Sequence, residues 1–103
     1  MNLKEINTRL GAILAELKIK IPELEKAETK YWYRYYELIL SEVVANLSTE
    51  SKREAQAKGM LRQEGLTEKY YDLKLDVRML LTEKEILFKM ADNYRTLLTN
   101  RDL

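Results

Sequence analysis

The chain has 103 residues, enough for one domain that buries about 65% of the surface of its unfolded chain. Hydrophobic residues make up 46% and charged residues 34%, which excludes a disordered chain and a membrane-embedded one. The lack of His and Cys excludes thiol nucleophiles, disulfides, Cys/His zinc sites and imidazole bases. With 3 Gly and 1 Pro, phosphate-binding loops and tight hairpins are disfavoured, and we expect an all-α fold.

The first predicted helix covers 3–20, because apolar residues recur there at alternating spacings of three and four. This heptad seam consists of Leu3, Ile6, Leu10, Ile13 and Leu17. A break or kink is expected at Ile21, because the ring of Pro22 disfavours a helical backbone at the residue before it. Proline fits the first turn of a new helix, so a second helix is predicted over 23–47, with apolar residues on more than one face.

A third, short helix is predicted over 51–64. Ser51 and Glu54 match a capping box at its start, and Gly65 follows it in the position where helices commonly end.

The fourth predicted helix, over 67–98, begins at Thr67 and carries a heptad seam interrupted only by Lys84. The apolar members of this seam are Tyr70, Leu73, Val77, Leu80, Leu87, Ala91, Tyr94 and Leu98. About 31 residues extend about 47 Å, whereas a compact globule of this chain length has a radius of gyration of about 13 Å. We therefore expect a single all-helical domain over 1–103, built as an elongated hairpin or bundle of about four helices.

A second apolar stripe on the last helix lies away from this seam. It consists of Met79, Ile86, Met90 and Leu97. One neighbouring helix cannot cover both the seam and the stripe, so the pattern predicts either tight wrapping by the helices over 3–20 and 51–64 or burial against other subunits. We favour both, and expect a homo-oligomer with the stripe at its interface.

The segment from Lys30 to Tyr36 places five aromatic rings and two cations on two turns of one helix. Such rings bury large apolar bodies in cores and protein interfaces, which is the favoured interpretation. The alternative is a platform on which single-stranded nucleic acid stacks, with Trp32, Tyr33 and Tyr36 as candidate stacking residues.

Net charge is +1, and the only basic stretch runs from Ser51 to Arg62. Its cations are Lys52, Arg53, Lys58 and Arg62. They are typical of a solvated helix face, but they could also neutralise phosphates and form one groove with the aromatic rings.

Acidic pairs offer no convincing active site. Asp72 and Asp76 are neighbours on one helix face with cations beside them, and Glu83 and Glu85 fall on different faces. Solvated ion pairing explains both pairs. We therefore expect no catalytic residues, no metal, no cofactor and no enzymatic activity.

The stretch from Thr67 to Leu81, continuing from Met90 to Arg101, resembles small early-region helical proteins of tailed phages. In layout it is similar to phage recombination mediators, which load a strand-exchange protein on single-stranded DNA. The resemblance implies a long helical hairpin followed by a long C-terminal helix, ring assembly and sequence-tolerant DNA binding. The residues that would face the DNA are Lys52, Arg53, Lys58 and Arg62.

Two functions follow as hypotheses. The first is an oligomeric helical adaptor in phage recombination or replication that binds single-stranded DNA. The alternative is a protein-only module, such as an inhibitor or loader of a host enzyme, a partner of a recombinase or replication factor, or a structural bundle. The near-neutral charge favours the second unless assembly concentrates the basic stretches. The first residues fit neither a signal nor a transit peptide, so we expect a cytoplasmic protein, in the host cytoplasm if phage-encoded, without a membrane segment.

Overall fold

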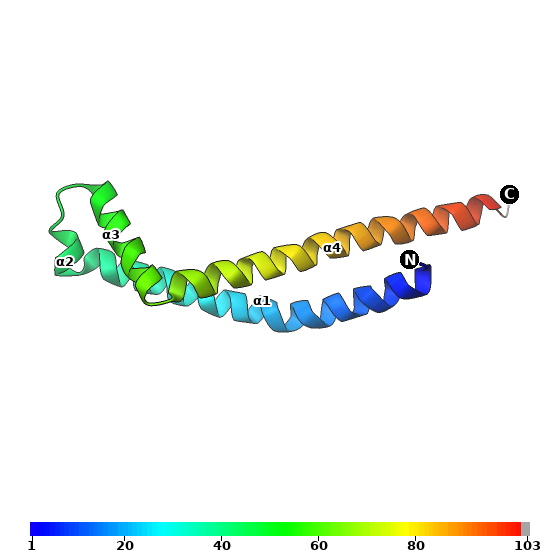
Figure 1. Ribbon diagram of the computed structural model, residues 1–103, viewed down its shortest axis with the longest axis horizontal. Coiled ribbons are helices and arrows are strands. Elements are labelled where there is room, and N and C mark those ends of the chain that lie inside the picture. The colour runs from blue at the N-terminus through cyan, green and yellow to red at the C-terminus, as the bar shows by residue number, and fades with distance from the viewer. Residues whose placement is uncertain (102–103) are drawn as a thin grey trace. The chain divides into compact units, whose positions relative to one another are not determined.

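The computed structural model describes residues 1–101, with side chains described as far as Thr99, and every regular element in this range is an α-helix (Figure 1). The elements are α1 (Leu3–Leu40), α2 (Glu42–Ala45), α3 (Glu50–Gln63) and α4 (Leu66–Arg101). The all-α fold with a long C-terminal helix is therefore confirmed. The helices divide into two compact units, one made of Met1–Ile21 with the residues from Asp76 onward and the other of Pro22–Leu75. The single domain expected over 1–103 stays a prediction.

α1 continues through Pro22, so the break predicted at Ile21 is wrong. Proline removes one backbone donor and crowds the carbonyl one turn earlier, at a cost of about 3 kcal/mol in a helix interior. Leu17 before the proline and Ala27 after it are both buried, which shows that the seam extends on either side of Pro22. Packing along this seam therefore overrides the local penalty.

The helix predicted over 23–47 ends earlier, at Leu40. Ser41 adopts an extended backbone with φ −69° and ψ 148°, and its hydroxyl donates a hydrogen bond of 2.6 Å to the carbonyl oxygen of Leu38. A serine hydroxyl that satisfies a carbonyl of the last turn competes with the next backbone bond of the helix. The chain then forms the four-residue helix α2, whose Val44 is buried.

The caps of the last two helices differ from the predicted ones. Thr49, not Ser51, caps α3, because its side chain accepts a hydrogen bond of 3.2 Å from the backbone N–H of Lys52. Gly65 has φ +76°, a conformation that favours glycine, and it ends α3 as predicted. Thr67 lies inside α4, and its hydroxyl oxygen is buried without a hydrogen-bond partner among the described residues.

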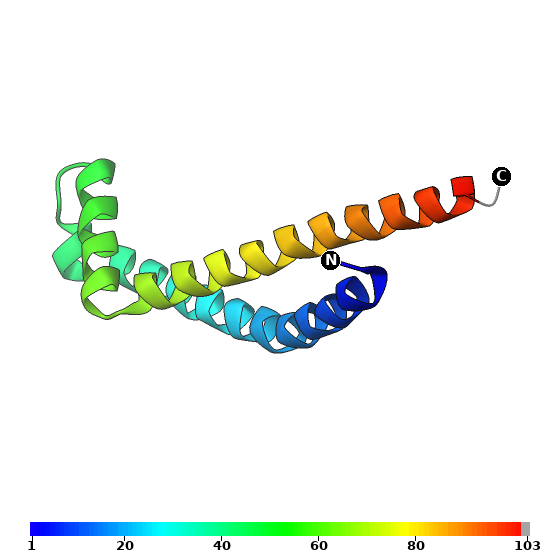
Figure 2. The same ribbon diagram turned by 45° about the vertical axis from the view of Figure 1, so that its right-hand side comes forward.

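In the first unit, α1 and α4 lie side by side and run antiparallel (Figure 1 and Figure 2). Arg9 forms a two-pronged ion pair with Glu83 at 2.7 and 2.8 Å, and Lys20 contacts Asp76 at 2.9 Å. Residue numbers thus increase along α1 as they decrease along the facing part of α4, as in any antiparallel pair of helices. The buried residues of this unit are Ile6, Leu10, Ile13, Leu17, Val77, Leu80, Leu87 and Ala91, which confirms these members of both predicted seams.

The last two members of the predicted α4 seam are not covered. Tyr94 is 37% exposed and Leu98 is 50% exposed. Because Arg9 lies opposite Glu83, α1 reaches its first residues before α4 reaches Tyr94, and α4 continues past the start of α1 in both views (Figure 1 and Figure 2). Tyr94 and Leu98 follow the apolar spacing of the buried seam residues, but no described part of the chain lies opposite these two positions.

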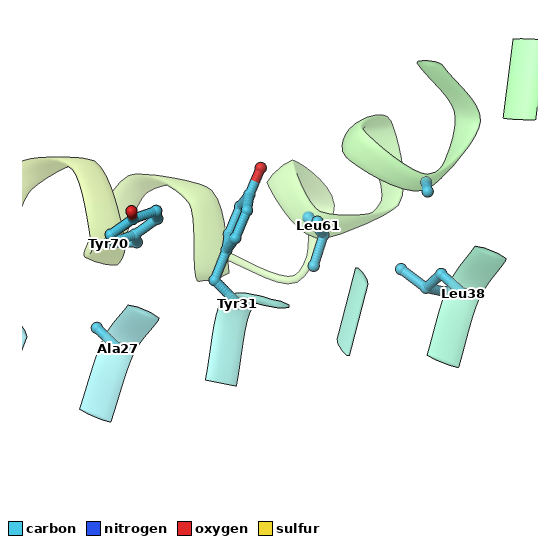
Figure 3. Packing of buried hydrophobic residues seen from close by; sticks show 6 residues of the cluster. Ala27, Tyr31, Leu38, Leu61 and Tyr70 are labelled. Atoms are coloured by element: carbon cyan, nitrogen blue, oxygen red, sulfur yellow. The ribbon is translucent and has the colours of Figure 1, made fainter. Parts of the chain in front are cut away.

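The core of the second unit joins α1, α3 and the start of α4. Its buried residues are Ala27, Tyr31, Leu38, Ala57, Leu61 and Tyr70. The Tyr31 ring rises from α1 into the space between Tyr70 and Leu61 (Figure 3), and its centroid lies 5.0 Å from that of Tyr70. The side chain of Tyr31 therefore lies at the point where the three helices pack together.

Candidate interaction surfaces

The aromatic run divides between the core and the exterior. Successive residues of an α-helix are about 100° apart, so five aromatic residues within six positions cannot share one side. Tyr31 is buried and Tyr35 is half-buried, and burial is the main cause that raises the pKa of both phenols. The interpretation of these rings as core residues thus holds for Tyr31 and in part for Tyr35. Trp32, Tyr33 and Tyr36 are exposed.

The exposed rings form a surface that we call the aromatic face. It consists of Glu25, Glu28, Thr29, Trp32, Tyr33 and Tyr36, which line a shallow groove of about 460 Å³ on α1. Tyr33 is 71% exposed and Tyr36 is 61% exposed, whereas Trp32 is held at 40% by edge-on contacts with Tyr31 and Tyr35 at 5.0 and 5.5 Å. The aromatic face therefore combines three exposed rings, of which Trp32 is held by its neighbours, with two carboxylates.

The four predicted cations on α3 do not act as one group. Lys52 donates to the Ser48 hydroxyl at 3.4 Å, and half-buried Arg53 donates to the carbonyl oxygen of Leu47 at 3.0 Å. Lys58 and Arg62 are exposed, about one turn apart, and form no ion pair with any described residue. Lys58 and Arg62 are thus the exposed cations of α3 for which no side-chain hydrogen bond or ion pair to a described residue is found.

The aromatic face and the α3 cations do not form the single groove expected from the sequence. α3 packs through Ala57 and Leu61 against the side of α1 that carries Tyr31 and Leu38. The exposed rings lie about 100° to 160° around α1 from Tyr31, and their groove is lined by α1 alone. The two features therefore belong to different sides of the second unit.

The second apolar stripe of α4 is left open, and we call it the outer stripe. It consists of Met79, Ile86, Met90 and Leu97. Met79, Ile86 and Leu97 are 61%, 53% and 63% exposed, and Met90 is half-buried. At about 100° per residue these four positions fall within about 40° of one another around α4. The structure thus leaves Met79, Ile86 and Leu97 exposed along one line, with Met90 half-buried on the same line.

The acidic pairs on α4 contribute to ion pairs in the first unit. Asp76 contacts Lys20, and the hydrogen bond from Arg9 to Glu83 lowers the pKa of that carboxyl and raises the pKa of the guanidinium. Among the described residues, no group of three acidic side chains is placed to hold a metal ion.

Sequence reasoning missed two features of the second unit. Glu25 and Glu28 precede Trp32 by seven and four residues, a spacing that places all three on one helix face and was available as a signal. Arg34 binds both carboxylate oxygens of Glu64 at 2.8 to 3.1 Å, which lowers the pKa of Glu64. A separation of 30 residues leaves no local signal for this contact.

Comparisons with protein-family models, curated proteins and solved structures found no match to this chain. Within residues 1–101, none of the helices combines the length and apolar character needed to cross a bilayer. The surfaces described above are therefore the basis for any functional conclusion.

Proposed function

We propose that this chain is a non-enzymatic helical adaptor that binds proteins and associates with itself through the outer stripe of α4. The observation that carries this proposal is the exposure of Met79 and Ile86 although α1 already fills the seam of α4 beside them, with Leu97 exposed further along the same line. Lines of large exposed apolar side chains on soluble proteins commonly mark interaction sites.

The borders of the outer stripe support pairing with another helix. Met79 and Ile86 are seven residues apart, the spacing at which helices present side chains to one partner. Arg9 with Glu83, and Lys20 with Asp76, form ion pairs alongside the stripe. An apolar centre beside polar, paired charges is the usual composition of a protein interface.

Replacing Met79 and Ile86 together by Glu is expected to weaken self-association at least about 100-fold, because burying a large apolar side chain contributes about 1.5–3 kcal/mol. Light scattering after size exclusion reports the mass, and circular dichroism should show that helix content is kept. The matched control replaces Leu81 and Phe88 by Glu, seven residues apart on the opposite flank of α4, and should leave the mass unchanged. A monomeric parent at high micromolar concentration, or equal effects of both pairs, would contradict the proposal.

Single-stranded DNA binding is the second candidate, in line with the resemblance to phage recombination mediators. The observation that favours it is the exposure of Lys58 and Arg62 without ion-pair partners among the described residues. Opposing it, the exposed rings that would stack on bases lie beside Glu25 and Glu28, whose charge repels phosphates.

If DNA binds, Lys58→Ala with Arg62→Ala should reduce the slope of log affinity against log salt by up to about 1.4, since each single-strand phosphate contact contributes about 0.7. Titration of a labelled oligonucleotide at several salt concentrations measures this slope. Lys4→Ala with Lys18→Ala removes the same charge from the exposed side of α1 and should change the slope less. Absence of binding at low salt would eliminate this candidate.

A further inference from the structure

The aromatic face carries negative charge that the described chain does not neutralise. Glu25 and Glu28 are exposed and take part in none of the ion pairs of the described residues. Aromatic rings attract cations through their faces, and carboxylates pair with them directly. The chemistry of this face therefore fits a cationic surface that also has room for bulky rings.

The outward side of α3 has both properties, and we call it the α3 outer face. It consists of Ala55, Lys58, Gly59 and Arg62, which fall within about 100° of one another around the helix. Ala57 and Leu61, which bury α3 against α1, lie on the opposite side from Gly59. The α3 outer face thus presents two unpaired cations beside two very small residues.

Gly59 has no explanation within the chain's own packing. A Cβ added at this position would meet no atom within 4 Å, and its φ is not positive. Glycine weakens a helix interior relative to alanine, so the fold would gain from a larger residue here. Close approach of another molecule to the α3 backbone would explain why glycine stands at this position.

We propose that the α3 outer face of one copy of this chain docks on the aromatic face of a second copy. Lys58 and Arg62 are separated by four residues and Glu25 and Glu28 by three, so each pair spans about one helical turn. Two helices lying against each other can therefore form both ion pairs at once. The occupant is a second copy because both complementary surfaces are present on this chain, and their charged residues form no ion pair with any described residue.

The rings of the aromatic face complete the contact. Trp32 is fixed by its edge-on neighbours Tyr31 and Tyr35, so it loses little conformational freedom when it binds. The open space over Gly59 accepts an aromatic ring, and the guanidinium of Arg62 stacks on a neighbouring ring face. Charge fixes the register of this interface, and ring burial supplies apolar contact.

The two halves of the proposed interface are different surfaces of the same chain. After the first contact, one copy therefore keeps its aromatic face free and the other keeps its α3 outer face free, and further copies add until a ring closes or a filament grows. This inference goes beyond the proposed function, because it does not use the outer stripe of α4.

Charge reversal tests the interface. The experiment uses the full chain carrying Met79→Glu and Ile86→Glu, so that association through the outer stripe does not mask the result. At low salt we expect assemblies larger than a monomer that dissociate in 1 M salt, which screens charges beyond about 3 Å. Lys58→Glu with Arg62→Glu, or Glu25→Lys with Glu28→Lys, should each weaken low-salt association at least about tenfold, because like charges then face each other.

Mixing the two charge-reversed proteins is the decisive step. The acidic α3 outer face of one variant fits the basic aromatic face of the other, and the two unaltered faces fit each other as in the parent. Light scattering should therefore show assemblies that contain both variants in equal amounts and that neither variant forms alone. Trp32 is the only tryptophan, and its fluorescence should change on mixing. The control Glu23→Lys with Glu85→Lys makes the same change in charge at exposed positions outside the aromatic face and should leave assembly intact.

Gly59→Ala provides a second measurement that does not alter charge. We expect it to raise the melting temperature of the stripe-deficient chain while weakening its low-salt association. A monomeric parent at low salt, no complex on mixing, or an equal loss in the Glu23/Glu85 control would overturn the proposal. So would an oligonucleotide that binds through Lys58 and Arg62 while these residues leave the protein's mass unchanged.

Discussion

Tyr31→Ala is expected to lower the free energy of unfolding by about 3–5 kcal/mol, the usual cost of removing a buried aromatic side chain. Tyr31 is 3% exposed, and its ring lies among Ala27, Leu61 and Tyr70. Its removal would leave a cavity where α1, α3 and α4 meet, and no neighbouring side chain can fill it without leaving its own contacts. Denaturant titration followed by circular dichroism measures the change at one fixed protein concentration.

Tyr33→Ala is the matched control for this prediction. It removes the same side chain two residues away on α1, but Tyr33 is 71% exposed. Surface substitutions of this kind usually change stability by no more than about 0.5 kcal/mol. Equal losses for the two variants would show that the aromatic run is not divided between core and exterior.

Ile13→Ala is expected to destabilise the first unit by about 2–5 kcal/mol. Ile13 is 0% exposed and lies in the seam between Leu10 and Leu17 on α1. Its deletion removes apolar contacts with α4 and leaves a cavity. Hydrogen exchange followed by mass spectrometry should detect faster exchange in peptides from residues 1–21 and 76–99.

The neighbouring substitution Leu14→Ala controls for helix propensity, because alanine replaces a large aliphatic residue in the same turn of α1. Leu14 is 52% exposed, so its loss should cost much less than that of Ile13. A larger loss of stability for Leu14→Ala than for Ile13→Ala would contradict the assignment of Ile13 to the buried side of α1.

The helices themselves could be predicted because apolar periodicity is a local property of the sequence. Ile6, Ile13, Val77 and Leu87 are buried where alternating spacings of three and four place them. The break at Pro22 was wrong because its local penalty competes with tertiary packing on both sides, which no short segment reveals. Both ends of α3 were predicted to within one residue, whereas α1 ends at Leu40 and not at the predicted residue 47, where the Ser41 hydroxyl bonds the carbonyl oxygen of Leu38.

The candidate surfaces could be predicted only in part. Residue type and spacing identified the outer stripe and the aromatic rings, but which rings are buried depends on where α3 and α4 pack against α1. The expected groove between rings and cations required α3 to lie beside Trp32, whereas it lies over Tyr31 and Leu38. No local sequence pattern shows which side of α1 is covered by α3, or that Arg34 pairs with Glu64.

The division of the helices between two units has a consequence for the order of folding. The Arg34–Glu64 contact of the second unit closes a loop of 30 residues, whereas the Arg9–Glu83 contact of the first unit closes one of 74. For a flexible chain the longer loop costs about 0.8 kcal/mol more in closure entropy. We expect Pro22–Leu75 to form the folding nucleus. The first half of α1 and the part of α4 from Asp76 onward would then pair by local steps, starting from the residues next to this nucleus.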